Sequence, residues 1–358
     1  MVKYRPVWLR KKLCYIARVF QFMRMKRKFD IGVILPNTQL FGGVRRFFEL
    51  GKLFIQDGHT MTIFSPDGKH PDWLNFQGSV KSLRDMHAHP VDALFITETQ
   101  FLAPLLASAA PLKFFYHVGP RANLKPVLRH KEITILSNST NMYRYDRRRY
   151  GISTTLAPGG VHIAAHPKTI SFPQQPFHIM CYGRLARKGK GTGLVVKAAE
   201  KLYRMGYNVK LLMFDRPLDE KGFRQIEQFQ PKVPFEFILN HPVEENEQLF
   251  KRADVFVAVE KKGGWCNTAA EAMACGVPVV ASETGTADFL EDGITGLKVW
   301  RHPYFIRKAI QKLIGNIELQ QLLAGNGYTK IQTLDWPHLA NRILHILQEQ
   351  WEKQHTKQ

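Results

Sequence analysis

A glycine loop, a helix start and a single acid fall together in the segment AVEKKGGWCNTAAEAMACGVPVVAS, residues 258–282. Consecutive glycines let a ligand approach the backbone closely, and Asn267 or Thr268 is a residue type that commonly caps a helix. Amides at a helix start attract phosphate, whereas Glu271, one turn further on, suits the hydroxyl groups of a sugar. A small-residue helix packed on a sheet is the alternative, but it leaves the Gly-Gly-Trp-Cys-Asn run unexplained. The residues that we expect to contact the ligand are Gly264, Trp265, Cys266, Asn267, Thr268 and Glu271.

A second glycine loop, GRLARKGKG at residues 183–191, is strongly basic. It follows the apolar run at residues 177–182, which predicts a buried strand. Arg184 together with Lys190, or with Lys188 instead, would reach a diphosphate from the end of that strand and stabilise it as a leaving dianion. A solvated basic loop without a ligand is the alternative.

The N-terminal half offers further candidates. Gly42 and Gly43 precede a helical pattern at residues 44–56, although two glycines before a helix are by themselves weak evidence for a ligand. His117 ends the apolar run KFFYHV. A lone histidine at a strand end is more often structural, but in a doubly wound sheet it would face the ligand crevice and hydrogen-bond a sugar. Glu98 sits similarly in ITETQ and could hold an acceptor hydroxyl.

The elements that position these residues alternate between strand and helix, which predicts an α/β protein with two doubly wound parallel sheets. The proline-rich stretch HPKTISFPQQP, residues 166–176, indicates a linker between two units. We expect an N-terminal domain at residues 30–168 and a C-terminal domain at residues 169–335. Strands are predicted at residues 31–35, 59–64, 93–97, 113–117, 133–137, 177–182, 209–214, 235–239, 255–259 and 277–281, with helices at 193–205, 244–252, 268–275 and 336–353.

The 358-residue chain carries 51 Lys and Arg against 30 Asp and Glu, a net charge of +21. This balance favours anionic partners such as nucleic acid, an anionic membrane leaflet or phosphorylated substrates. The four cysteines lack metal-type spacing, which predicts reduced thiols and no metal site. Neither a membrane-spanning stretch nor a secretory signal is recognisable, so we expect a cytoplasmic location.

The basic residues gather in the segment at residues 1–29, where lysines and arginines interleave with apolar residues at helical spacing. That pattern favours a helix lying on an anionic membrane surface, and a helix packed on its own domain is the alternative. The stretch YRYDRRRY at residues 143–150 adds to the basic surface. We therefore expect peripheral association with the inner face of the cytoplasmic membrane.

Several motifs together resemble glycosyltransferase family 4, whose members are retaining enzymes of the GT-B fold. The resemblance rests on FGGVRRFFELGKLFIQDGH, APGGVHI, YGRLARKGKGTGLVVKAA, NHPVEENEQLFKRADVFVAV and GGWCNTAAEAMACGVPVVASETGTADFLEDGITGL, and it covers nearly all of the chain from Asp30 onward. It implies two Rossmann-like domains that face each other across a cleft, with the final helix at residues 336–358 crossing back to the first. It also implies a nucleotide-diphosphate sugar as donor, with no metal or other cofactor.

The resemblance assigns roles residue by residue. Glu271 matches the glutamate that holds the nucleotide ribose, and Arg184 with Lys190 matches the cationic pair on the diphosphate. Gly42 and Gly43 match the glycine loop near the phosphates. The resemblance also places His117 beside the donor sugar and leads us to expect backbone contacts to the donor from Gly285 and Thr286.

One departure concerns the transferred sugar. The family commonly has a further glutamate eight positions before Glu271, and here that position is Gly263. The missing glutamate usually touches the sugar, so its identity and turnover itself are open. Glu260 stands three residues earlier and could substitute if the loop is reshaped.

The resemblance implies transfer of a sugar to a glycan or glycolipid acceptor in the synthesis of cell-envelope polysaccharide or lipopolysaccharide. The alternative is a nucleic-acid-directed protein on the same scaffold, either a DNA-modifying glycosyltransferase or a binding protein without activity. The tyrosines and arginines of residues 143–150 would then stack on bases and hold phosphates.

Overall fold

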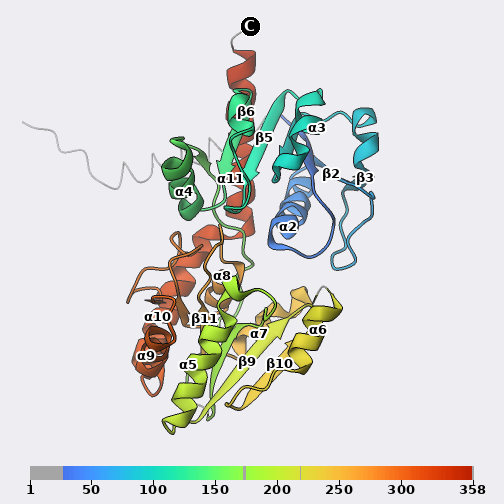
Figure 1. Ribbon diagram of the computed structural model, residues 1–358. Helices are drawn as coiled ribbons and strands as arrows, with labels where there is room; N and C mark the ends of the chain where they lie inside the picture. Colours follow the sequence, from blue (N-terminus) through green and yellow to red (C-terminus); the bar gives the residue numbers. More distant parts are fainter. Residues whose placement is uncertain (1–26, 172–174, 218, 357–358) are drawn as a thin grey trace, which may run out of the picture.

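The computed structural model describes residues 27–171, 175–217 and 219–356, which form two α/β lobes placed one above the other (Figure 1). Each lobe contains one parallel sheet, one of seven strands and one of six, so the predicted fold class is confirmed. The basic N-terminal segment lies outside the described residues except for residues 27–29. In the described part of the chain, no helix is both long and apolar enough to cross a membrane.

The N-terminal sheet has the strand order β3-β2-β1-β4-β5-β6-β7, with the change of direction beside β1. Its central strands are buried because helices cover both faces, as is usual for parallel sheets. The elements of this lobe are β1 (Asp30–Ile34), α2 (Gly42–Gln56), β2 (Thr60–Ser65), β3 (Ser79–Ser82), β4 (Ala93–Ile96), α3 (Leu102–Ala107), β5 (Leu112–His117), β6 (Ile133–Ser137), α4 (Thr140–Tyr150) and β7 (Thr155–Leu156).

The C-terminal sheet has the order β10-β9-β8-β11-β12-β13, with the change of direction beside β8. In both lobes a loop therefore leaves the carboxyl end of a central strand at the point where ligands of such folds bind. The elements are β8 (Phe177–Tyr182), α5 (Thr192–Arg204), β9 (Val209–Asp215), α6 (Glu220–Glu227), β10 (Phe235–Leu239), α7 (Asn246–Lys251), β11 (Val255–Ala258), α8 (Asn267–Ala274), β12 (Val279–Ala281), β13 (Leu297–Lys298), α9 (Pro303–Leu313) and α10 (Ile317–Ile331).

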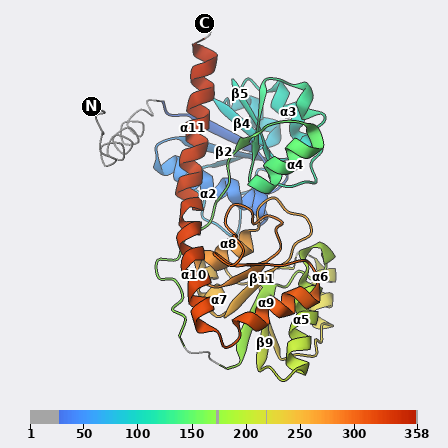
Figure 2. The same ribbon diagram turned by 90° about the vertical axis from the view of Figure 1, so that its left-hand side faces the viewer.

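The final helix, α11 (Trp336–His355), packs against α2 and runs along the N-terminal lobe (Figure 2). Its apolar side, which includes Leu339 and Ile343, belongs to the same hydrophobic core as β1 and α2. The chain crosses between the lobes at Gly159 and Gly160, whose positive φ angles and lack of Cβ let them lie against Leu334 and Trp336. The two crossing segments thus hold the lobes together beside the cleft.

Two helix starts differ from the prediction. Helix α2 begins at Gly42, so the glycine pair forms its first turn instead of a preceding loop. Helix α8 begins at Asn267 with Cys266 as its N-cap residue, and no side chain caps it, so the predicted cap by Asn267 or Thr268 is wrong. Both helices consequently present backbone N–H groups that no capping side chain satisfies.

Candidate functional site

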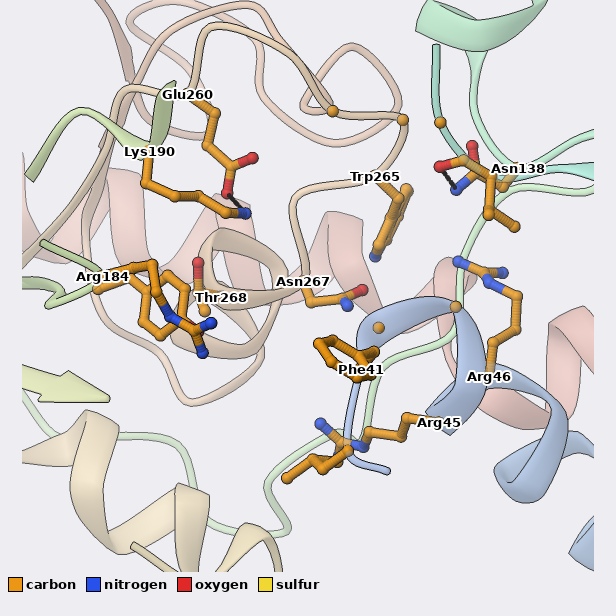
Figure 3. A pocket seen from close by; sticks show the side chains of 18 of the residues that line it. Phe41, Arg45, Arg46, Asn138, Arg184, Lys190, Glu260, Trp265, Asn267 and Thr268 are labelled. Atoms are coloured by element: carbon orange, nitrogen blue, oxygen red, sulfur yellow. Dashed lines mark hydrogen bonds and ion pairs between the residues drawn. The ribbon is translucent and has the colours of Figure 1, made fainter. Parts of the chain in front are cut away.

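A cavity of about 790 Å³ lies between the two lobes, within the size range of small-molecule sites. Figure 3 shows side chains from α2 and the β6–α4 loop facing side chains from the loop after β8 and from the start of α8. Of the predicted site residues, the following line it: Gly42, Gly43, Arg184, Lys190, Gly264, Trp265, Asn267, Thr268 and Glu271. The structure therefore brings most of the predicted constellation into one place.

The basic loop after β8 contributes two cations, each held by an acid. Arg184 Nε lies 2.8 Å from Asp215 Oδ1 at the end of β9, and Lys190 Nζ lies 2.6 Å from Glu260 Oε1. Both cations remain partly accessible from the cavity, where they can meet an anionic ligand. Lys188 is exposed and does not line the cavity, which favours Lys190 as the second cation.

Arg187, from the same loop, lines the cavity and was not predicted. It is exposed and takes part in none of the salt bridges within the described residues. Its position between the two predicted cations in GRLARKGKG was the signal available in the sequence.

The start of α8 presents polar groups to the cavity. Trp265 is buried, and its Nε1 has no hydrogen-bond partner among the described residues. Asn267 and Thr268 belong to the first turn of the helix, and Glu271 lies one turn further on. Cys266, in contrast, is buried and does not line the cavity, so its expected ligand contact is not supported. Burial raises the pKa of its thiol to about 12.

Glu260 is a buried acid at the wall of the cavity, with 7% of its surface exposed. Its carboxylate reaches the glycine that occupies the position of the family's missing glutamate: a Cβ on Gly263 would lie 3.0 Å from Glu260 Oε2. Gly263 therefore leaves room for the Glu260 side chain. The loop thus places the Glu260 carboxylate beside residue 263, although residue 263 itself has no side chain.

The N-terminal lobe places two adjacent arginines on α2 at the cavity. Arg45 Nη1 lies 2.5 Å from Glu271 Oε1, so the two lobes are joined by an ion pair at the acid expected to bind ribose. Arg46 is buried, donates from Nη1 to Tyr116 Oη at 3.0 Å and has no acidic partner within the described residues. These arginines were not predicted as site residues, although both occur in the quoted FGGVRRFFELGKLFIQDGH motif.

Arg45 also forms an ion pair with Glu49, one turn further along α2. Arg45 Nε lies 3.3 Å from Glu49 Oε1, and His162 Nε2 lies 3.0 Å from the same oxygen. Burial raises the pKa of Glu49, but the hydrogen bond and charge of His162 and the charges of Arg45 and Lys52 outweigh this and lower it to about 2. For Arg45, burial lowers the pKa, and the two acids reverse this, so its pKa is raised.

A second set of contacts between the lobes involves Gly264 and Asp288 of the C-terminal lobe. Ser139 Oγ donates to the backbone oxygen of Gly264 at 2.6 Å. Thr140, at the start of α4, donates from its backbone N–H and its hydroxyl to the carboxylate of Asp288, at 3.0 and 2.6 Å. The Asp288 carboxylate thus caps a helix of the opposite lobe, where the helix dipole favours a negative charge.

The loop residues Gly285 and Thr286 do not reach the cavity. The backbone oxygen of Gly285 accepts a hydrogen bond from the Cys266 N–H, and the hydroxyl of the buried Thr286 donates to the Ser282 backbone. Their predicted backbone contacts to the donor therefore have no support in this arrangement. The loop instead braces the start of α8.

His117 is also absent from the cavity wall. It is completely buried at the end of β5, with Nδ1 2.8 Å from Asp146 Oδ1 on α4. Its Nε2 has no partner among the described residues. In this structure the histidine ties β5 to α4, as in the structural alternative, and its contact with a donor sugar stays a prediction.

Glu98 lines the N-terminal side of the same cavity, as expected for a residue at the carboxyl end of β4. Arg121 lines it nearby and is exposed. Within the residues that the structure describes, no three His, Cys, Asp or Glu side chains gather where they could hold a metal ion.

Comparison with known proteins finds a family similarity in the C-terminal lobe. Residues 163–330 match the model of the family described as glycosyl transferases group 1. The chain is 29% identical over 185 residues to the capsular polysaccharide biosynthesis glycosyltransferase CapM of Staphylococcus aureus, a match that covers 48% of this chain and 47% of CapM. The chain spans about half the length of the curated relatives it matches.

Solved structures match nearly the whole chain. Sucrose-phosphate synthase from Thermosynechococcus elongatus has a TM-score of 0.75 at 16% identity, covering 91% of this chain and 100% of its own. HepE from Anabaena, solved with UDP and glucose, has a TM-score of 0.71 at 15% identity, covering 89% and 99%. The chain therefore has the GT-B fold, and most of its C-terminal lobe matches the glycosyl transferases group 1 model.

Proposed function

We propose that this chain is a retaining glycosyltransferase that moves a sugar from a nucleotide-diphosphate sugar to a glycan or glycolipid acceptor. The observation that carries the proposal is the convergence of Arg184, Lys190 and the uncapped start of α8 on one cavity between the lobes. Cations and free amides from separate elements form a site for a diphosphate there. The group 1 match and a similarly folded protein solved with UDP-glucose support the same donor class.

The proposed chemistry is mainly electrostatic. Arg184 and Lys190 neutralise the charge that develops on the leaving diphosphate, and the first N–H groups of α8 add partial positive charge. Contact between the lobes excludes water from the reacting centre. With retention, the acceptor hydroxyl attacks from the face that the diphosphate leaves, so a diphosphate oxygen can take its proton and no dedicated base is needed.

We propose an acceptor in cell-envelope polysaccharide or lipopolysaccharide synthesis, at the inner face of the cytoplasmic membrane. The similarity to CapM, which is named for capsular polysaccharide biosynthesis, supports this class. Cations on the N-terminal side of the cavity, including Arg46 and Arg121, would attract an acceptor that carries phosphate. We further propose that transfer requires no metal ion.

The donor is tested by thermal unfolding with UDP-, GDP-, ADP- and dTDP-sugars. A ligand at about 100 times its Kd stabilises the folded chain by about 2.7 kcal/mol, so one class should raise Tm by several degrees. The rise should disappear in Glu271→Ala and persist in Glu227→Gln, an exposed acid outside the cavity. No shift with any nucleotide sugar would refute the proposal, and an inverted anomeric centre in the product would refute retention.

A further inference from the structure

One flank of the C-terminal lobe exposes five large hydrophobic side chains. They come from the end of α5, from the segment before α9 and from the first turn of α9, and these two helices pack side by side (Figure 2). Trp300 is the most exposed, at 76%. We call this surface the aromatic flank, and it consists of Tyr203, Met205, Trp300, Tyr304 and Phe305.

Contacts link three of the five side chains of the aromatic flank, Met205, Tyr304 and Phe305. The rings of Tyr304 and Phe305 meet edge to face with centroids 5.3 Å apart, and the ring of His302 lies 6.1 Å from that of Phe305. The Arg307 guanidinium lies 5.3 Å from the Tyr304 ring, and its Nη1 is 3.8 Å from Met205 Sδ. Arg307 therefore joins the α9 part of the flank to the α5 part.

The core does not account for the exposed aromatics. Helix α9 uses Ile306, Ile310 and Leu313 to cover the sheet, and Tyr304 and Phe305 remain exposed to solvent. Several large apolar side chains exposed on one part of the surface are costly in water and typically mark a binding surface.

The positive charge around the aromatic flank favours an anionic partner. Residues 298–312 contain five Lys and Arg and no Asp or Glu. Lys298 and Lys308 are exposed beside the aromatics, and Lys201 and Arg204 are exposed on α5. Amphipathic aromatic rings among cations are the combination that binds the headgroup region of an anionic membrane.

The flank begins beside the cavity. Arg301 Nε donates to the backbone oxygen of Val259 at 2.7 Å, and the next residue, Glu260, lines the cavity. A membrane bound to the aromatic flank would therefore lie close to the C-terminal side of the cavity.

We propose that the aromatic flank docks the protein on an anionic membrane surface. The exposed rings enter the headgroup region, and the surrounding lysines and arginines contact lipid phosphates. This docking adds to any contribution of residues 1–26 and does not require that the cavity bind a nucleotide sugar.

The test is cosedimentation of the full chain with phosphatidylcholine vesicles, with and without phosphatidylglycerol. We expect binding to the anionic vesicles that weakens with added salt. The triple variant Trp300→Ser, Tyr304→Ser, Phe305→Ser should bind at least about tenfold more weakly, because it removes the apolar contact with the membrane. The matched control replaces Phe223 and Leu322, exposed hydrophobic residues on α6 and α10, by Ser and should bind like the wild type.

Quenching supplies a second readout. Brominated lipid in the anionic vesicles should quench Trp fluorescence of the wild type more than that of Trp300→Phe, which keeps an aromatic ring at this position. Unchanged vesicle binding by the triple variant, or equal quenching in the two proteins, would overturn the proposal. Preferential binding of duplex DNA that the triple variant loses would also overturn it. These experiments contain no sugar donor. Their results therefore do not depend on whether the protein transfers a sugar.

Discussion

Lys190 and Glu260 form an ion pair at the donor side of the cavity, with Nζ 2.6 Å from Oε1. The lysine is one of the two cations proposed for the diphosphate, and the acid lies beside the glycine that replaces the family's sugar-contacting glutamate. One contact therefore connects the proposed leaving group with the proposed sugar position. The contact also indicates a role for Glu260 in holding Lys190, which the sequence alone did not predict.

Replacing Glu260 by Gln should slow sugar transfer while retaining the binding of free nucleoside diphosphate. The variant loses a charged hydrogen-bond acceptor near the sugar, which costs roughly ten- to hundredfold in rate, but it leaves Lys190 free to hold the diphosphate. Steady-state kinetics and calorimetric titration with the nucleoside diphosphate separate the two effects. Equal losses of transfer and of nucleoside diphosphate binding would show that Glu260 only supports the loop.

Removing the guanidinium of Arg45 should weaken donor binding by about tenfold, or about 1.4 kcal/mol, with a smaller effect on kcat. Arg45 orients the Glu271 carboxylate from the opposite lobe, and without it that carboxylate is partly buried and unpaired. The measurement is the donor affinity of Arg45→Ala. Lys52→Ala is the control, because Lys52 lies on the same helix but is more exposed and makes only a long ion pair with Glu49, at 3.9 Å. Tighter donor binding by Arg45→Ala would instead show that Arg45 competes with the ribose.

Glu49 should make the protein sensitive to acid. Its pKa is about 2 in the folded chain against 4.5 for a glutamate in water, so it contributes stability above pH 4.5 that is lost as the pH falls toward 2. The difference corresponds to about 3 kcal/mol at neutral pH.

Chemical denaturation of Glu49→Gln should show most of this loss at pH 7 and little of it near pH 2.5. Glu227→Gln, at an exposed position, should match the wild type throughout. A constant difference between Glu49→Gln and the wild type across this range would contradict the assignment.

The strand pattern of both sheets was predictable because parallel strands are short, apolar and bounded by turns. The predicted strands at 133–137, 177–182 and 235–239 have the observed bounds. Strand β12 starts two residues later than expected, after Pro278, which lacks an N–H for the ladder. The four-residue edge strand β3 and the two-residue strands β7 and β13 were missed, because they carry too few residues to show a period.

The donor loops of the site were predictable because their glycines and cations are contiguous in sequence. The contacts between lobes were not, because they join residues as far apart as Arg45 and Glu271, and local pattern carries no information on such pairs. His117 shows the same limit: its position at a strand end was right, but its burial against Asp146 depends on the packing of α4.

Gly264 lies where the lobes meet closely, and its lack of a side chain sets how near they come. A Cβ at this position would collide with the Val118 backbone oxygen and lie 2.5 Å from Asn138 Oδ1, both on the N-terminal lobe. Turning the end of a flexible side chain cannot relieve both contacts, since one partner is backbone. Gly264→Ala should therefore hold the lobes apart, break the Ser139 hydrogen bond and abolish most donor binding.

Small-angle scattering should then report a larger radius of gyration for Gly264→Ala, and calorimetry a loss of donor affinity. Gly193→Ala is the matched control, because that glycine lies in α5 and a Cβ there would have nothing within 4 Å. Alanine there removes flexibility from the unfolded chain and should leave stability equal or slightly higher, by up to about 1 kcal/mol. If Gly264→Ala kept wild-type dimensions and donor affinity, the contact between the lobes would not be what assembles the site.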